Sequence, residues 1–121
     1  MTITIGNGVT SIGYSAFQNC SYVSNIVIPD SCESIGSNAF AGCSNLYSIT
    51  FGTGIESISS GLFGDNTRLT LLTLKHTEGV VELSGAIPST VTSIYVPSAL
   101  VDAYKADSAW SAYRTKIRAI Q

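Results

Sequence analysis

The chain has 121 residues, the length of a single domain, with a formal net charge of −2. Only 12% of its residues are charged, about half the typical fraction of roughly 25%. A surface with so few charges argues against binding to nucleic acid, because such binding requires a concentrated basic patch. No run approaches the roughly 18 consecutive apolar residues of a membrane span, and no signal peptide is recognisable.

Apolar residues recur at one fixed spacing through the first two thirds of the chain. A period of roughly 20–29 residues predicts a solenoid of the leucine-rich-repeat kind, about 23 residues per repeat here. The domain should therefore span residues 1–97, with repeats starting near 3, 26, 49 and 72. The 23-residue step joins Ile3, Ile26, Ile49 and Leu72; Ile12, Ile35 and Ile58; Phe17, Phe40 and Phe63; and Ser11, Ser34 and Ser57.

Each repeat opens with a short run that alternates in polarity. Such alternation predicts strands whose first and third residues point inward and whose middle residue points outward. Gly or Pro follows most of these runs and directs the chain away from the sheet. Parallel stacking about 4.8 Å apart would give a ladder roughly 20 Å long. The predicted strands are residues 3–5, 26–28, 49–51, 72–74 and 94–96.

Two further features follow within each repeat. A second extended segment, at residues 9–12, 32–35 and 55–58, has apolar ends that should point inward. A tight, helical turn comes next and carries the repeated phenylalanine, so Phe17, Phe40 and Phe63 are expected to stack. The fourth repeat departs from the pattern: Val81 keeps the register of Ile58, but residues 75–90 lose it.

After Pro97 the pattern becomes helical. We predict a cap over residues 98–121 made of two helices, the first capped by Ser98 and the second by Asp107 or Ser108. Trp110 should anchor this cap. The basic residues Arg114, Lys116 and Arg118 fit the solvated face of a terminal helix better than an anionic-surface contact. The predicted inward residues are Leu100, Val101 and Tyr104 in the first helix and Trp110, Tyr113, Ile117 and Ile120 in the second.

Candidate reactive groups are few. Cys20, Cys32 and Cys43 lack the paired spacing of a zinc site and are expected to be reduced packing residues. His76 is the only histidine, and we expect it in a surface loop without a nucleophile beside it. We therefore expect no enzyme activity, no catalytic residue, no metal and no cofactor.

Residues 26–46, which read I-x-I-P-D-S-x-x-S-I-G-S-N-A-F-A-G-C-S-N-L, resemble the BspA-like or Treponema-type leucine-rich repeat. The ending from Ile94 through Tyr113 also looks like the closing segment of many such proteins. This resemblance implies a right-handed coil on bacterial cell-surface or secreted proteins that adhere to host proteins or other cells. It implies no catalytic residues.

The outward face of the strand ladder is the best candidate site, because tyrosine there offers rigid, amphipathic surface for a partner. The alternative for its threonine and serine rows is that these β-favouring residues keep the sheet soluble. The favoured function is a non-enzymatic module that binds a protein or glycan, without nucleic acid and without membrane insertion. The alternative is a structural or self-assembly domain, a virion- or tail-associated piece or a fragment of a larger surface protein, that associates through an uncapped N-terminal end. The candidate residues are Tyr22, Val27, Tyr47, Thr50, Thr73 and Tyr95.

Overall fold

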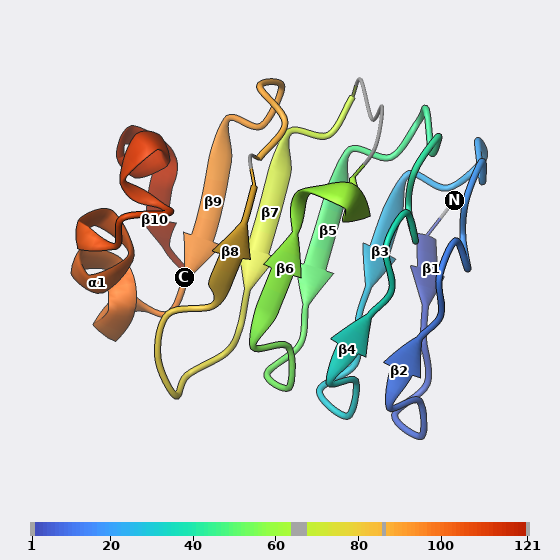
Figure 1. Cartoon of the computed structure of the whole chain (residues 1–121), viewed down its shortest axis with the longest axis horizontal. Coiled ribbons are helices and arrows are strands. Elements are labelled where there is room, and N and C mark those ends of the chain that lie inside the picture. The colour runs from blue at the N-terminus through green and yellow to red at the C-terminus, as the bar shows by residue number, and fades with distance from the viewer. Residues whose placement is uncertain (1, 64–67, 86, 121) are drawn as a thin grey trace.

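The computed structural model describes residues 2–63, 68–85 and 87–120. These residues form a stack of coils in which one parallel sheet runs along one side (Figure 1). The main sheet has six strands in the order β1-β3-β5-β7-β9-β10. Each coil begins with one of these strands, so successive strands lie side by side. The strands are β1 (Thr2–Thr4), β3 (Asn25–Val27), β5 (Ser48–Phe51), β7 (Leu71–Leu74), β9 (Ser93–Val96) and β10 (Ile117–Ala119).

The register of the main sheet confirms the 23-residue step. Ile3 pairs with Ile26, which pairs with Ile49, and the series continues through Leu72 and Ile94. The middle members of this row are fully buried, as are Ile28 and Phe51 two positions further on. The strands begin one residue earlier than predicted, but the inward and outward positions are as expected.

The opposite side of the coils carries shorter strands in two separate pairs. β2 (Ser11–Ile12) pairs with β4 (Ser34–Ile35), and β6 (Ser57–Ser59) pairs with β8 (Glu82–Ser84). Among the described residues no sheet pairing joins β4 to β6, so this side is divided between the second and third coils. The predicted second extended segments are therefore present but shorter.

The turns that carry the phenylalanines are not continuous helices in the first two coils. The Ala16 and Gln18 amides donate to carbonyls three residues back, whereas the Phe17 amide donates to the Ala39 carbonyl of the next coil. Residues with positive φ at repeated positions permit this alternation: Ser15 and Asn38 share one position, and Asn19 and Gly42 another. In the described part of these turns, only the third coil has a short 3₁₀ helix, η1 (Ser60–Leu62).

The phenylalanine rings occupy the interior as predicted. Phe40 and Phe63 are buried, whereas Phe17 in the first coil is only half-buried. The Phe17 and Phe40 rings stack, with centroids 5.8 Å apart and planes inclined by 19°. The spine therefore runs through the described coils and becomes partly exposed at its N-terminal end.

The register prediction for the fourth coil was wrong. Ile58 pairs with Leu83, not with Val81, so β8 has shifted by two residues relative to the strict repeat. Val81 is nevertheless buried, because it lies under the C-terminal cap. Ala86, which stands where the 23-residue step after Phe63 would place the next phenylalanine, lies outside the described residues.

The predicted two-helix cap was also wrong in its second half. A short 3₁₀ helix, η2 (Ser98–Leu100), leads into α1 (Val101–Ala106), but Ser98 makes no capping bond to α1, whose N-cap is Leu100. The second predicted helix is instead η3 (Ser111–Lys116), a 3₁₀ helix, followed by β10. Ile117 pairs with Ile94, 23 residues earlier, so the repeat spacing returns after the cap. The boundary at residue 97 between solenoid and cap stays a prediction, since β10 extends the main sheet.

The cap is held by side chains that bond to the backbone of the fourth coil. The Val81 amide donates to the Tyr104 hydroxyl at 2.9 Å, and Trp110 Nε1 donates to the Val81 carbonyl at 2.7 Å. Both aromatic side chains are fully buried, with ring centroids 5.4 Å apart in an edge-to-face arrangement. Trp110 is thus the anchor that was predicted. Asp107 caps the turn between α1 and η3, accepting from the Ala109 amide at 2.9 Å.

Candidate binding face

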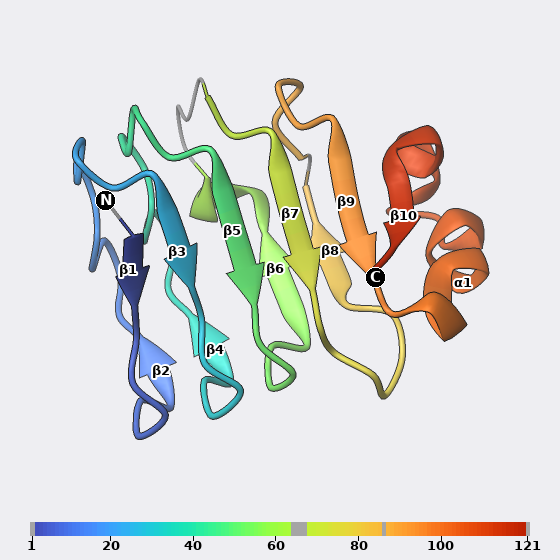
Figure 2. The same ribbon diagram turned by 180° about the vertical axis from the view of Figure 1, so that it is seen from behind.

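The outer face of the main sheet is a regular surface six strands wide. Figure 2 shows it with no helix or loop across it, since the cap lies at the end of the stack. Its outward positions form rows across the strands because every strand has the same register. One row, which we call the central row, consists of Thr4, Val27, Thr50, Thr73, Tyr95 and Arg118.

The structure brings together four of the six candidate residues. Val27, Thr50, Thr73 and Tyr95 lie side by side in the central row, all partly exposed. Tyr22 and Tyr47 are not in this row. They precede β3 and β5 and are exposed by 81% and 49%, so they extend the aromatic surface at the strand entries.

A second row of outward residues lies two positions before the central row along each strand, and two of its side chains are hydrogen-bonded to each other. It contains Asn25, Ser48, Leu71 and Ser93. The Ser48 hydroxyl donates to the Asn25 side-chain oxygen at 2.6 Å, and Ser48 is buried. The Ser48 hydroxyl and the Asn25 oxygen thus satisfy each other, which leaves the central row as the more available part of this region.

An apolar hollow of about 380 Å³ lies at the C-terminal end of this face, lined by Leu71, Thr73, Tyr95 and Ile120. Leu71 and Ile120 were not among the predicted site residues. A signal for Leu71 was present, since it stands where neighbouring coils have asparagine or serine. Ile120 was missed because it was assigned to a helix, whereas its amide donates to the Val96 carbonyl at 2.8 Å beside the sheet.

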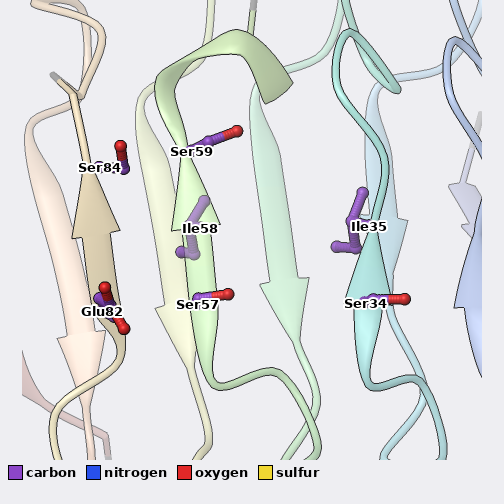
Figure 3. Close-up of a pocket in the computed structure, with 7 residues that line it drawn as sticks. All are labelled: Ser34, Ile35, Ser57, Ile58, Ser59, Glu82 and Ser84. Atoms are coloured by element: carbon purple, nitrogen blue, oxygen red, sulfur yellow. The ribbon is translucent and has the colours of Figure 1, made fainter.

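A second, polar hollow of about 270 Å³ lies where the opposite side is divided between β4 and β6. Figure 3 shows its residues coming from β4, β6 and β8, with the side chains of Ser57 and Ser59 extending from the same side of β6. Serine hydroxyls and one carboxylate can hydrogen-bond to water or to a polar ligand. Within residues 2–63, 68–85 and 87–120 no group of three or more His, Cys, Asp or Glu side chains is placed to hold a metal. The hollow is lined by Ser34, Ile35, Ser57, Ile58, Ser59, Glu82 and Ser84.

His76 lies in a loop, as predicted, but its side chain is buried, so the prediction of a surface position was wrong. Its side chain is only 8% exposed, and Nδ1 lies 2.6 Å from the Thr53 carbonyl oxygen. Because a carbonyl can only accept, the proton of the bond must be on Nδ1. His76 therefore joins the fourth coil to the third, a structural role.

The three cysteines are free, with Cys32 and Cys43 buried and Cys20 partly buried. The Cys43 thiol donates to the Phe17 carbonyl at 3.1 Å. Burial raises the pKa of the Cys32 and Cys43 thiols, which keeps them protonated and unreactive at neutral pH. Their expected role in packing fits this environment.

The chain was compared with known families and structures. The family model described as BspA type leucine rich repeat region (six copies) matches residues 1–101. A similar solved structure is that of a leucine rich cell surface protein from Faecalibacterium prausnitzii, at 26% identity and a TM-score of 0.44. The similarity covers 99% of this chain but 31% of that protein, so this chain spans about a third of its length. No curated protein matches the sequence. None of the helices in the described part of the chain is long and apolar enough to cross a membrane.

Proposed function

Because the chain belongs to the BspA-type leucine-rich repeat family, we propose that it is a non-enzymatic binding or adhesion module whose outer sheet face holds a protein or glycan. The observation that carries this proposal is the uncovered face itself, six parallel strands wide (Figure 2). Binding there needs no movement of the fold, because the strands are fixed by the buried residues behind them. We further propose that the protein acts at the bacterial cell surface or outside the cell, as expected for this family.

The chemistry of the face favours adhesion through contact area over charge. Threonine and valine occupy the middle of the central row, and all of its members before Arg118 are uncharged. Such a row loses little hydration energy when covered, because no charge has to be desolvated. The exposed Tyr22 and Tyr47 add rigid area at low entropic cost.

The proposal is tested by presenting the immobilised chain with a panel of host extracellular-matrix proteins and with a glycan array. We expect Tyr47→Ala and Tyr95→Ala each to weaken capture of the same ligands. The control is Tyr14→Ala, because Tyr14 is 72% exposed but follows β2 on the other side of the coil. Equal binding by the two ladder variants and the wild type, or selective loss with Tyr14→Ala, would count against the face.

A second candidate function is end-to-end association, and one observation favours it. The first coil leaves one edge of β1 unpaired in the described residues, and Ile3, Ile5 and Phe17 beside it are only partly buried. An unpaired strand next to apolar side chains is a template for another strand. We expect this function to show as concentration-dependent mass in light scattering. A constant monomer mass across the concentration range would exclude it.

A further inference from the structure

We propose that the C-terminal end of the outer face binds an extended, acidic peptide segment of the partner, with an apolar side chain in the hollow beside Tyr95 and a carboxylate on Arg118. This inference rests on the proposed function, since it names the ligand chemistry of the same face. It is carried by the hollow, by the position of Arg118 and by the distribution of charge over the two sides of the coil.

The hollow arises where the outward rows depart from their own pattern. Leu71 stands in a row of asparagine and serine, and Tyr95 follows Thr50 and Thr73 in the central row. Ile120 adds a third apolar side chain from beyond β10. Three large, mainly apolar side chains thus meet at one place on a face whose other strand positions, apart from Arg118, carry smaller side chains. None of the three is fully buried, so the hollow is open to a partner.

Arg118 lies next to this hollow. It pairs with Tyr95 across neighbouring strands, which lie about 4.8 Å apart. It lies two residues before Ile120, whose amide continues the pairing with β9 by donating to the Val96 carbonyl, so the two side chains share a face. Arg118 is exposed, and no ion pair holds it among the described residues. The neighbouring cation Lys116 is engaged differently, with its ammonium 6.0 Å from the centre of the Tyr113 ring.

In and beside the strands, the solenoid carries different charges on its two sides; Asp30, Arg68, Lys75 and Glu78 lie in the segments between them. The central row has a single charge, that of Arg118. Carboxylates occur instead on the opposite side, where Glu82 lies in β8 and Glu33 and Glu56 immediately precede β4 and β6. An acidic ligand is therefore attracted to the outer face and repelled from the other side.

The lining favours a peptide over a glycan. Thr73 contributes the only aliphatic hydroxyl among the four lining residues, and Leu71 and Ile120 offer no hydrogen bond from their side chains. Sugar hydroxyls placed against Leu71 and Ile120 would lose water without finding partners. An apolar side chain loses no such bonds. In an extended peptide, side chains two residues apart lie roughly 6.6 Å apart, a spacing compatible with neighbouring positions on this face.

The test uses capped peptides and amide NMR of the ¹⁵N-labelled chain. The probe is Gly-Ser-Phe-Ser-Asp-Ser-Gly, and its matched variants replace Phe by Ala or Asp by Asn. We expect shift changes centred on Tyr95 and Arg118. The Phe-to-Ala peptide should bind about tenfold more weakly because it loses apolar burial. The Asp-to-Asn peptide should bind about two- to fivefold more weakly, as for an exposed ion pair.

Two protein variants connect the effect to the named residues. Arg118→Gln should abolish the difference between the Asp and Asn peptides, and Tyr95→Thr should reduce the difference between the Phe and Ala peptides. Lys105→Gln is the charge control, because Lys105 is an exposed cation in α1, away from the row. Arg118→Gln and Tyr95→Thr alter partly or fully exposed side chains, and we expect the spectra to show an unchanged fold.

Other outcomes overturn the inference and separate it from the proposed function. Undiminished discrimination in Arg118→Gln overturns it, as does tighter binding of a glucuronic acid disaccharide than of the peptide. Peptide shifts confined to Val27 and Thr50 overturn the inference but leave the outer face as the binding surface. Peptide shifts on β6 and β8, together with panel binding that ignores Tyr47→Ala and Tyr95→Ala, overturn both.

Discussion

The two ends of the solenoid use the same repeat in different surroundings. At the N-terminal end, Ile3 and Phe17 occupy positions that are fully buried in the next coil, yet they are only partly buried themselves. At the C-terminal end, Tyr104, Trp110 and Ile117 bury the last coil. A residue's contribution to stability in a solenoid therefore depends on whether its neighbouring coil is present, as well as on its place in the repeat.

The ends also differ in the kind of bond that holds them. Between the regular coils, the same backbone hydrogen bond recurs at equivalent positions of the repeat, as in Phe17 to Ala39 and Phe40 to Leu62. At the cap, aromatic side chains bond instead to the two backbone groups of Val81. A backbone shifted by two residues cannot continue the repeated ladder with the same pairs. Side-chain hydrogen bonds from the cap therefore satisfy the backbone amide and carbonyl of Val81.

Trp110→Ala should produce the largest loss. It removes a fully buried indole and the bond to the Val81 carbonyl, so we expect roughly 4–5 kcal/mol, at the upper end for aromatic truncation. Urea denaturation of the wild type and the variant measures this loss in the free energy of unfolding. Trp110→Phe separates the causes, because it keeps most of the apolar volume and loses the bond. A loss below about 1 kcal/mol for Trp110→Ala would show that the cap does not stabilise the stack.

The phenylalanine positions provide a direct comparison between an interior coil and the end. Phe40→Ala should cost about 3–5 kcal/mol, the usual range for a buried aromatic. Phe17→Ala should cost about half as much or less, since the ring is already partly exposed. Urea denaturation of both variants is the measurement. Equal losses would mean that Phe17 has a covering neighbour in solution.

Tyr104 gives the cap a dependence on alkaline pH. Burial raises the pKa of this hydroxyl in the folded state, so the folded protein keeps a proton that the unfolded chain loses first. Stability is therefore retained below the unfolded pKa of about 10 and falls as the pH rises above it, by up to about 1.4 kcal/mol per pH unit. Tyr104→Phe should be less stable at pH 7 by about 1–3 kcal/mol, because the Val81 amide loses its acceptor.

The pH dependence of unfolding in wild type and Tyr104→Phe checks this prediction. The variant should lose less stability between pH 10 and 11, because one linked proton has been removed. Cys32→Val and Cys43→Val serve as controls, since burial also raises the pKa of these thiols and they contribute to the same alkaline limb. Parallel alkaline limbs in wild type and Tyr104→Phe would contradict the assignment.

Glycine at one repeat position should give the most selective effect. A Cβ at Gly52 would lie 2.6 Å from the Pro29 carbonyl carbon of the preceding coil, whereas nothing lies within 4 Å of a Cβ at Gly6. Gly52→Ala should therefore cost about 1–3 kcal/mol through the forced backbone shift. Gly6→Ala should be neutral or slightly stabilising, as expected when alanine fits without strain. Thermal unfolding of the two variants tests the pair, and a loss in Gly6→Ala equal to that in Gly52→Ala would refute the explanation.

The repeat could be predicted because the same residue types recur every 23 residues along the sequence. Ile26 and Ile49 confirm each other in sequence, so the register of the main sheet followed from spacing alone. The same holds for the buried phenylalanines. The central row with Val27, Thr50, Thr73 and Tyr95 was correctly placed, because alternation within a strand determines which side chains point outward.

The rest depended on contacts that occur once. Ile117 and Ile120 have a spacing that suits a helix, but pairing with β9 satisfies the edge of the sheet. His76 was predicted at the surface because its local sequence is polar, and only the Thr53 carbonyl of the previous coil explains its burial. The apolar hollow could not be predicted for the same reason, since Ile120 reaches it only once β10 has formed.

Two arginine substitutions in the same coil test most directly whether the outer face is the binding surface. Thr50 lies in the middle of the central row, and Ser57 lies in β6 on the opposite side. Surface plasmon resonance should be recorded with a ligand captured from the matrix-protein panel or the glycan array. We predict that Thr50→Arg reduces affinity at least tenfold while Ser57→Arg leaves it within twofold. Retained affinity in Thr50→Arg together with loss in Ser57→Arg would contradict the claim.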